Sequence, residues 1–324
     1  GAARDNGDRT SLRYLRGHFR VTSQTPSNAR GISPKSADFT KALKDALDAE
    51  QAGQSYGAVG KLLRERLPIL RKDPFETMLR GDRIARHHAQ SIDDLVKTLF
   101  NLAPIPKNTK RGEVTVCAVG GYGRRMLAPY SDVDLLFLYG TSDAEEIRGQ
   151  VDSLLYPLWD SGIKIGHAVH TPKSAVEFCK EDMVARTAFL DARFLCGSKK
   201  KFKDFEKHFD GLRRRTIREF VVAKLEEQEA RQTRAGETRY LVEPDVKEGN
   251  GGLRDLQMLR WLFKYGFGAE IGASSAIDKV MDASERRALI KAEQFLWSVR
   301  TQLHDLRGYA DEKLAFDIQP QIAA

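Results

Sequence analysis

The chain reads Cys117-Ala118-Val119-Gly120-Gly121-Tyr122-Gly123-Arg124 and then, after a short polar turn, Ser131-Asp132-Val133-Asp134-Leu135-Leu136-Phe137-Leu138. This stretch predicts an apolar strand, a glycine turn and a second strand that opens with two carboxylates one residue apart. Because side chains alternate across a strand, we expect Asp132 and Asp134 on one face, where they repel each other unless a cation lies between them. A divalent metal with a phosphate is therefore the expected occupant.

Glycines in the turn favour the same chemistry. Gly120, Gly121 and Gly123 allow close backbone approach and can direct N–H groups at an anion, which holding a triphosphate requires. Many turns share such a run, so its weight comes from the aspartates downstream. A phosphate cradle and a metal pair are the two parts that nucleotidyl transfer needs. The alternative, polar residues at a strand edge, is disfavoured because two carboxylates at the mouth of a buried strand are costly without a counter-ion.

Composition sets broader bounds. The chain has 324 residues, 41% hydrophobic and 30% charged, as expected for a globular protein of about two domains. Its net charge of +8 favours acidic partners such as nucleotides, nucleic acid or an acidic protein surface. Three scattered cysteines exclude a disulfide framework and indicate a reducing cytoplasm. The sequence contains no apolar run as long as a membrane span.

The pattern along the chain predicts an α+β protein. We expect a flexible arginine-rich arm over 1–32, a helical segment over 33–106, a core with a small mixed sheet over 107–198 and a helical domain over 199–324. A third strand is expected over 163–169. The expected helices are one that begins at Ser33-Pro34, then 59–70, 74–102, 151–159, 174–180, 182–196, 202–232, 253–265 and 284–306.

The loop over 247–255 is the one expected break in the later helices. Gly249, Gly251 and Gly252 precede a helix whose first residues include Arg254. A helix N-terminus with free N–H groups, flanked by Lys247 and Arg254, can form an anion site. A glycine-rich turn with solvent-facing cations fits the residues equally well.

The combination of Gly-Gly, a spacer and Asp-x-Asp resembles the polymerase-β-like nucleotidyltransferase superfamily. The longer string over 120–138 is more specific, and it is similar to the bacterial PII uridylyltransferase/uridylyl-removing family in its N-terminal part. Three further stretches carry this resemblance: 159–169, 240–255 and 314–319. Together they cover nearly everything after the arm.

This resemblance implies a nucleotidyltransferase core, and a two-metal transfer of a uridylyl group from UTP to a tyrosine of the PII nitrogen-signalling protein with release of pyrophosphate. Asp132 and Asp134 would be catalytic and bind Mg²⁺. The nucleotide would be bound by Gly120, Gly121, Arg124, Ser131, Lys247 and Arg254. The implied partners are UTP and PII, without nucleic acid or membrane, in the cytoplasm.

Family members continue into a phosphohydrolase domain that removes the uridylyl group, so the chain is expected to be a fragment that transfers the uridylyl group without removing it.

The chain also departs from the family pattern. Arg125 and Tyr130 replace residues that are usually smaller, and His170 stands where an arginine is expected. The superfamily usually supplies a third carboxylate from the next strand, but 163–170 contains no acid. Asp160 is a weak candidate for that role and is equally well explained as a helix-terminal residue.

Two rival functions fit parts of the pattern. An adenylyltransferase acting on glutamine synthetase shares the glycine turn, the Asp-x-Asp and a related lysine-glycine loop. A catalytically silent nucleotide-binding or protein-interaction module would fit the missing carboxylate. An RNA-directed transferase is less consistent with the sequence, because the basic residues are dispersed and lack an aromatic stacking surface.

Overall fold

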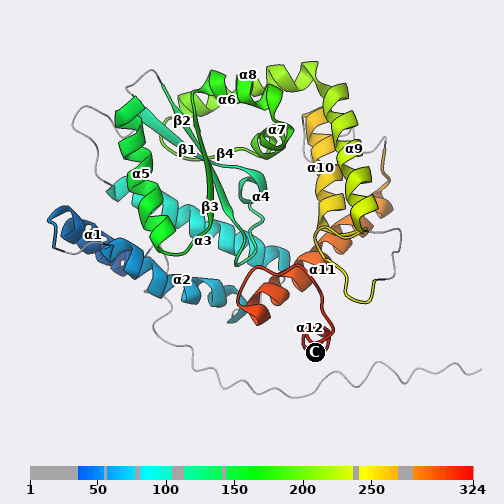
Figure 1. Ribbon diagram of the computed structural model, residues 1–324, viewed down its shortest axis with the longest axis horizontal. Coiled ribbons are helices and arrows are strands. Elements are labelled where there is room, and N and C mark those ends of the chain that lie inside the picture. Colours follow the sequence, from blue (N-terminus) through cyan, green and yellow to red (C-terminus); the bar gives the residue numbers. More distant parts are fainter. Residues whose placement is uncertain are drawn as a thin grey trace, which may run out of the picture.

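The computed structural model of the chain describes residues 36–54, 57–76, 81–103, 113–140, 144–235, 241–268 and 280–323. A small four-stranded sheet lies between helices on both faces (Figure 1). The predicted α+β class is thereby confirmed. The arm expected over 1–32 lies outside the described residues, and the expected domain boundaries stay a prediction. No described helix is both long and apolar enough to cross a bilayer.

The sheet is mixed, with the strand order β3-β2-β1-β4. Its strands are β1 (Val114–Ala118), β2 (Val133–Tyr139), β3 (Ile165–His170) and β4 (Arg193–Cys196). Strand β1 is antiparallel to both of its neighbours, whereas β2 and β3 run parallel. The register places Asp134 opposite Gly166, so the second aspartate lies inside the sheet rather than before it.

Strict alternation along β2 divides its side chains between two cores. Leu135 and Phe137 face a core formed with four helices, and Leu136 and Leu138 face the opposite core. Burial on both faces explains why this strand reads as a nearly continuous apolar run. The first core is completed by α1 (Ala37–Gln51), α2 (Ala58–Glu76), α3 (Gly81–Leu102) and α5 (Ala144–Asp160).

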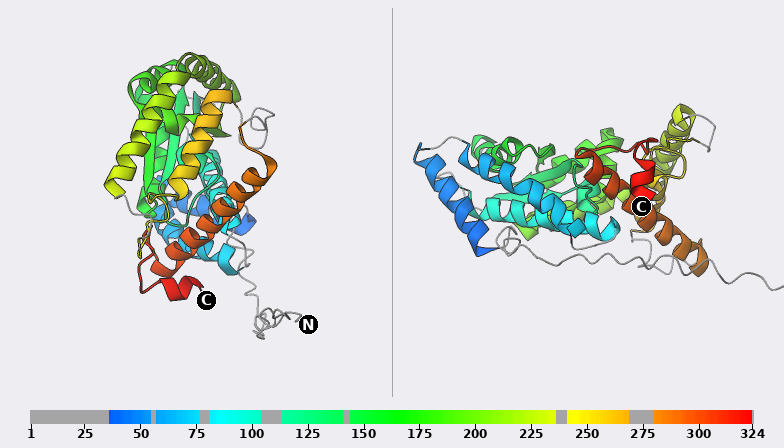
Figure 2. Two further views of the ribbon diagram at one scale, coloured as in Figure 1. Left: turned by 90° about the vertical axis from the view of Figure 1, so that its right-hand side faces the viewer. Right: turned by 90° about the horizontal axis from the view of Figure 1, so that it is seen from below.

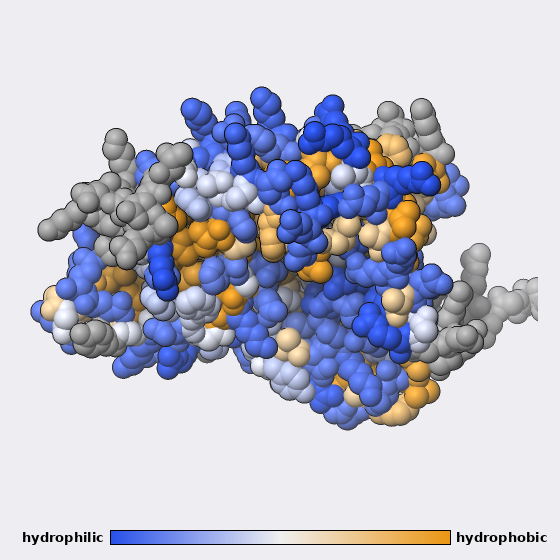
Figure 3. All heavy atoms as spheres, turned by 45° about the horizontal axis from the view of Figure 1, so that its top comes forward, coloured by the Kyte–Doolittle hydropathy of each residue, from blue (hydrophilic) through white to orange (hydrophobic). Residues whose placement is uncertain are grey.

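The second core contains the helices that lie above and beside the sheet in Figure 1. They are α6 (Pro172–Glu181), α7 (Met183–Leu190), α8 (Lys199–Arg215), α9 (Ile217–Ala235) and α10 (Leu253–Phe267). A row of phenylalanines on α8, Phe202, Phe205 and Phe209, fills it at helical spacing. This face of the molecule is mostly hydrophilic with small, separate apolar patches (Figure 3).

The long helix α11 (Ala283–Arg307) passes below the sheet and packs on α3 (Figure 2). The two helices approach closely at Gly81, where a Cβ would lie 2.1 Å from the Ser298 backbone nitrogen. After α11 the chain returns to pair with an earlier segment, since Val246 N donates to Glu312 O and Leu314 N to Pro244 O. The short helix α12 (Gln319–Ala323) follows. The 244–246 loop is thus tied to the end of the described chain.

Several predicted elements are wrong in detail. The helix expected over 182–196 ends at Leu190, and 193–196 form β4, because those residues pair with β1. The helix expected over 202–232 is broken at Thr216, which ends α8. The first helix begins at Ala37 with Ser36 as its N-cap, while Pro34 lies outside the described residues. Pro74 lies inside α2 instead of starting a helix.

Candidate functional site

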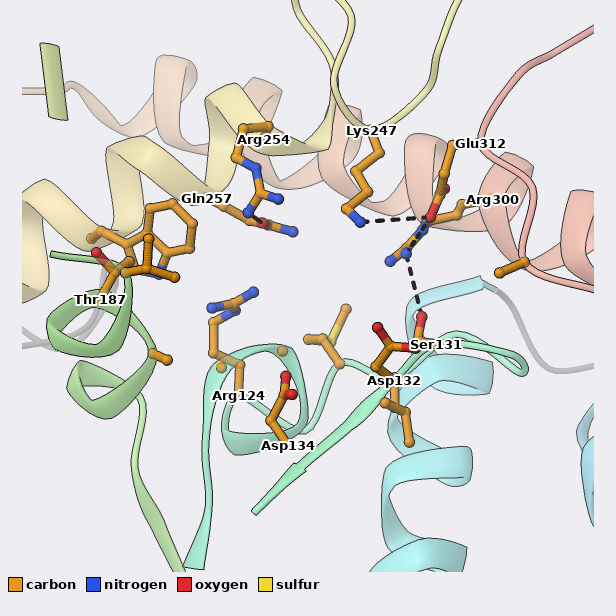
Figure 4. Close-up of a pocket in the computed structure, with 18 of the residues that line it drawn as sticks. Arg124, Ser131, Asp132, Asp134, Thr187, Lys247, Arg254, Gln257, Arg300 and Glu312 are labelled. Carbon is orange, nitrogen blue, oxygen red and sulfur yellow. Dashed lines mark hydrogen bonds and ion pairs between the residues drawn. The ribbon is translucent and has the colours of Figure 1, made fainter. Parts of the chain in front are cut away.

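A pocket of about 360 Å³ lies where the start of β2 meets α4 (Gly120–Gly123), α7, α9, α10 and α11. All eight residues predicted from the sequence line it: Gly120, Gly121, Arg124, Ser131, Asp132, Asp134, Lys247 and Arg254. We call it the central pocket (Figure 4). The fold thus brings the glycine turn, the aspartates and the distant 247–255 loop to one place. Their roles in binding stay predictions.

The glycine turn forms the four-residue helix α4, and its glycines have different structural reasons. Gly120 has a φ of 57°, and a Cβ there would lie 3.2 Å from Asp134 Oδ2. Gly123 does not line the central pocket, and a Cβ on it would lie 2.1 Å from the Asp191 carbonyl oxygen. Gly120 therefore makes room for an aspartate, whereas Gly123 lets α4 pack on the end of α7.

The Asp132 and Asp134 carboxylates form an incompletely compensated anionic pair. Burial raises the pKa of Asp134, the charge of Asp132 raises it further, and Arg124 and Lys247 oppose both effects. Beside Asp134, a Cβ on Gly166 would lie 2.5 Å from Oδ1, so the neighbouring strand leaves room for the carboxylate. Two close carboxylates with this electrostatic balance fit a Mg²⁺ ion, which is often held by one or two carboxylates plus substrate phosphates.

No carboxylate in the described part of the chain joins this pair as a third metal ligand. Among the described residues, no group of three or more His, Cys, Asp or Glu side chains is placed to hold a metal. Asp160 is exposed at the end of α5, where its backbone carbonyl accepts hydrogen bonds from Arg64, and it does not line the central pocket. The structure therefore gives Asp160 no place in the metal pair.

The loop before α10 is folded on itself. Asp245 accepts hydrogen bonds from the backbone nitrogens of Lys247 and Glu248, at 2.8 and 2.6 Å. The first N–H groups of α10 are also used, because Leu253 N donates to Val246 O and Arg254 N to Lys247 O. The prediction of free N–H groups at this helix start is therefore wrong. What the loop offers the pocket is the side chains of Lys247 and Arg254.

Helix α11 and the segment after it supply a network that the sequence did not indicate. Arg300 donates a 2.7 Å hydrogen bond to Glu312 and a 3.3 Å hydrogen bond to Ser131 Oγ (Figure 4). Lys247 Nζ lies 3.9 Å from the same Glu312 carboxylate. Burial raises the pKa of Glu312, but His304 and Arg300 outweigh it and bring that pKa to about 2. Glu312 is thus an anion that holds two pocket cations in place.

Trp261 of α10 forms another wall that was missed. The side chains of Arg124, Lys224 and Arg254 each place their charge 5.3–5.5 Å from its ring centre. Its indole N–H donates a 3.0 Å hydrogen bond to Asp191. The ring therefore sits among three pocket cations, an arrangement that cation–π attraction favours. Helical spacing in the sequence predicted α10 but carried no signal that Trp261 or Lys224 would face a pocket.

The central pocket combines opposite charges in separate places. Five cationic side chains line it: Arg124, Lys224, Lys247, Arg254 and Arg300. The acidic lining consists of Asp132, Asp134, Glu227 and Glu312, of which Glu227 and Glu312 are already paired with lysine or arginine. Such a site can hold a polyphosphate against the cations while Asp132 and Asp134 face a metal ion.

The comparisons with known proteins agree with one another. Residues 219–324 match the family model described as GlnD PII-uridylyltransferase. A protein of Erythrobacter litoralis named "Bifunctional uridylyltransferase/uridylyl-removing enzyme" is 39% identical over 293 residues, 87% of this chain. Proteins of the same name from Nitrobacter winogradskyi and Rhodopseudomonas palustris are 39% and 36% identical, over 86% and 94% of the chain. The chain spans 32% of the length of each of these relatives.

Proposed function

We propose, from the premise that this chain is related over most of its length to bifunctional uridylyltransferase/uridylyl-removing enzymes, that it transfers a uridylyl group from UTP to a tyrosine hydroxyl of a PII protein. The observation that supports this most is the convergence of all eight predicted residues on the central pocket. Those residues come from segments more than a hundred positions apart, so their meeting is a property of the fold. We place the reaction in the cytoplasm.

In this proposal the cations of the pocket bind and orient the triphosphate of UTP. Arg300 is fixed by Glu312 and Ser131, so its guanidinium is directed before substrate arrives. Lys247 and Arg254 reach the pocket from a loop that is braced by its own hydrogen bonds. Preorganised donors of this kind stabilise charge that develops on a leaving pyrophosphate without reorganising during the reaction.

Asp132 and Asp134 would hold Mg²⁺, which when bound supplies charge neutralisation and alignment at the reacting phosphate. The tyrosine oxygen forms a bond to the α-phosphorus, the bond from that phosphorus to the pyrophosphate oxygen breaks, and the hydroxyl proton is released. No covalent intermediate with the chain is needed, because positioning and electrostatic stabilisation account for such a transfer.

A labelling experiment tests the proposal. The purified chain is incubated with PII, Mg²⁺ and UTP labelled in the α-phosphate. The label incorporated into PII gives the rate, and the mass of PII gives the number of groups added. We expect one uridylyl group per modified tyrosine, and a loss of at least about a hundredfold in rate for Asp134→Asn. Asp160→Asn is the matched control and should keep the full rate. Full labelling by the Asp134 variant would refute the proposed site.

An adenylyltransferase acting on glutamine synthetase is the second candidate, because its pattern shares the glycine turn and the Asp-x-Asp. The same assay with labelled ATP and glutamine synthetase separates the two. We expect labelling only with UTP and PII. Nucleotide binding by calorimetry, without turnover of either pair, would instead favour a silent nucleotide-binding module.

A further inference from the structure

A second hollow adjoins the central pocket on the far side of Arg124. It has a volume of about 490 Å³ and shares four lining residues with the central pocket: Arg124, Met126, Gln257 and Trp297. These four form the partition between the two spaces. We call the second one the arginine cleft, and none of its remaining lining residues was used by the proposed reaction.

The lining of the arginine cleft is strongly cationic. It contains Arg86, Arg124, Arg125, Arg193, Arg260 and Lys264, against two carboxylates, Asp191 and Glu293. Six positive and two negative side chains leave an excess of four positive charges on the walls. A concave surface with such an excess concentrates field lines and attracts anions.

Most of these cations are held in place by internal partners. Arg260 pairs with Glu293, and both Arg124 and Lys264 pair with Asp191. Arg193 is directed toward Asp93 by two hydrogen bonds, of 2.6 and 2.9 Å. These pairs fix the shape of the cleft, and both of its carboxylates are already engaged in ion pairs.

Two arginines remain. Arg86 on α3 and Arg125 after α4 are exposed, and neither guanidinium forms a hydrogen bond or an ion pair within the part of the chain that the structure describes. Arg125 also has a φ of 60°, which is the left-handed region, and no other non-glycine residue of the described chain has a positive φ. That backbone conformation costs roughly 1–2 kcal/mol, so the chain holds the exposed Arg125 side chain in place at the expense of some stability.

We propose that the arginine cleft binds a small polyvalent phosphate anion, of which inorganic pyrophosphate is the simplest example, at the same time as a nucleotide occupies the central pocket. Guanidinium groups match the geometry of phosphate oxygens and can bind them through paired hydrogen bonds. With Asp93 behind Arg193 included, an excess of three positive charges remains, and it fits a polyvalent anion better than a single carboxylate. The volume is in the range of small-molecule sites.

The proximity of the two spaces suggests two sources for the anion. Pyrophosphate released in the central pocket would need only to pass Arg124, which lines both spaces. Another phosphorylated solute would enter the cleft from the exposed side, where Arg86 and Arg125 lie. The site stands on the cleft's own residues and goes beyond the proposed transfer, so it can be tested separately.

Equilibrium dialysis of labelled pyrophosphate tests the site. The chain is first saturated with a non-hydrolysable UTP analogue, and the free Mg²⁺ concentration is buffered so that chelation does not alter it. We expect one equivalent of pyrophosphate to bind to the saturated chain. Arg86→Gln combined with Arg125→Gln should raise the dissociation constant about tenfold or more, as expected for the loss of charge-assisted hydrogen bonds. Arg83→Gln, an exposed change on the same helix, is the matched control.

The proposal is overturned if the UTP analogue displaces all bound pyrophosphate, or if the double variant binds it as tightly as the Arg83 control. Thermal unfolding checks that each variant is folded. Arg125→Gly, which suits the left-handed backbone, and Arg86→Gln alone provide second variants. Dialysis of labelled UTP analogue reports on the central pocket separately, so a failure of the proposed function would be recognised as such.

Product inhibition then identifies the source. If the double variant is less inhibited by pyrophosphate during transfer, the anion comes from the neighbouring reaction. If inhibition is unchanged while dialysis shows loss of binding, another phosphorylated solute is the natural occupant. Both results support the site.

Discussion

Arg300 donates a hydrogen bond of 3.3 Å to the Oγ of Ser131, across a separation of 169 residues in the chain. Ser131 immediately precedes the first aspartate of the pair, so α11 is fastened to the strand start that carries the acidic residues. Glu312 holds the same guanidinium from the other side with a hydrogen bond of 2.7 Å. The position of the pocket cation and that of the aspartate segment are therefore coupled.

Arg300→Lys should weaken UTP binding. A lysine keeps the charge, but it lacks the planar guanidinium that donates hydrogen bonds to Ser131 and Glu312 together. One charge-assisted hydrogen bond is therefore lost. We expect the KM for UTP to rise about tenfold with a smaller change in kcat. Steady-state labelling of PII measures both. Arg287→Lys, exposed on the same helix, is the control, and equal KM values for the two variants would contradict the prediction.

Asp134→Asn should stabilise the chain in the absence of divalent cations while it abolishes transfer. Burial and the charge of Asp132 raise the pKa of Asp134, so this carboxyl stabilises the fold below its unfolded pKa, and that contribution is lost as pH rises through the folded pKa. An asparagine carries no charge, so the cost at neutral pH disappears. Thermal unfolding at pH 7 with a chelator should give a higher midpoint for the variant.

Adding Mg²⁺ provides the internal check on that result. The ion should raise the unfolding midpoint of the unmodified chain by binding the native state, and it should raise that of the Asp134→Asn variant much less. An equal increase for both proteins would show that the aspartate pair is not where the metal binds.

Gly166→Ala should reduce transfer through Asp134. The added methyl group would lie 2.5 Å from Asp134 Oδ1, so the carboxylate must move from its place. We expect a rate loss of about a hundredfold, similar to other displacements of a reacting group. Gly211→Ala on α8 meets no atom within 4 Å and should be neutral or stabilise the helix by about 0.5–1 kcal/mol. Wild-type rates for the Gly166 variant would disprove the crowding argument.

Glu312→Gln should remove an acid-sensitive part of the stability. The pKa of Glu312 is about 2 in the folded chain, against an ordinary value of 4.5. Because the folded pKa is depressed, the stabilisation is present above about pH 4.5 and is lost as pH falls toward 2. At neutral pH, the free energy of unfolding of the unmodified chain should be larger than that of the variant by on the order of 3 kcal/mol.

Urea unfolding at a series of pH values measures this difference. The two curves of stability against pH should converge as the pH falls from 4.5 to 2. A gap that stays constant over that interval would mean that the effect of the substitution is unrelated to ionisation of Glu312.

The sequence allowed the centre of the fold to be predicted, because that part depends on local patterns. The apolar runs that became β1 and β2 and the Asp132-x-Asp134 motif are local, and each was found where expected. Strand β4 was missed because its four residues follow a helical pattern, and only pairing with β1 makes them a strand. Tertiary pairing of this kind leaves little trace in a short stretch.

The site shows the same division. The motif residues were predicted to belong to one site and they line one pocket, whereas Arg300 and Glu312 were not predicted, although Arg300 contacts both Glu312 and Ser131. Both lie in segments whose sequence indicates only a helix or a turn, and their place in the pocket arises from contacts formed on folding. Lys224, which is 3% exposed, is a similar case: a buried lysine in a helix has no sequence signature that separates it from a surface lysine.

The ion pair between Glu312 and Arg300 has a consequence for synthesis of the chain. The aspartate segment leaves the ribosome about 180 residues before Glu312, since 312 minus 132 is 180. At roughly 5–20 residues per second, about ten seconds or more pass between the synthesis of the aspartate pair and the synthesis of Glu312. During this interval the ribosome-bound chain has Asp132 and Asp134 without the Glu312 contact that positions Arg300, so the complete lining of the central pocket exists only after translation has passed Glu312.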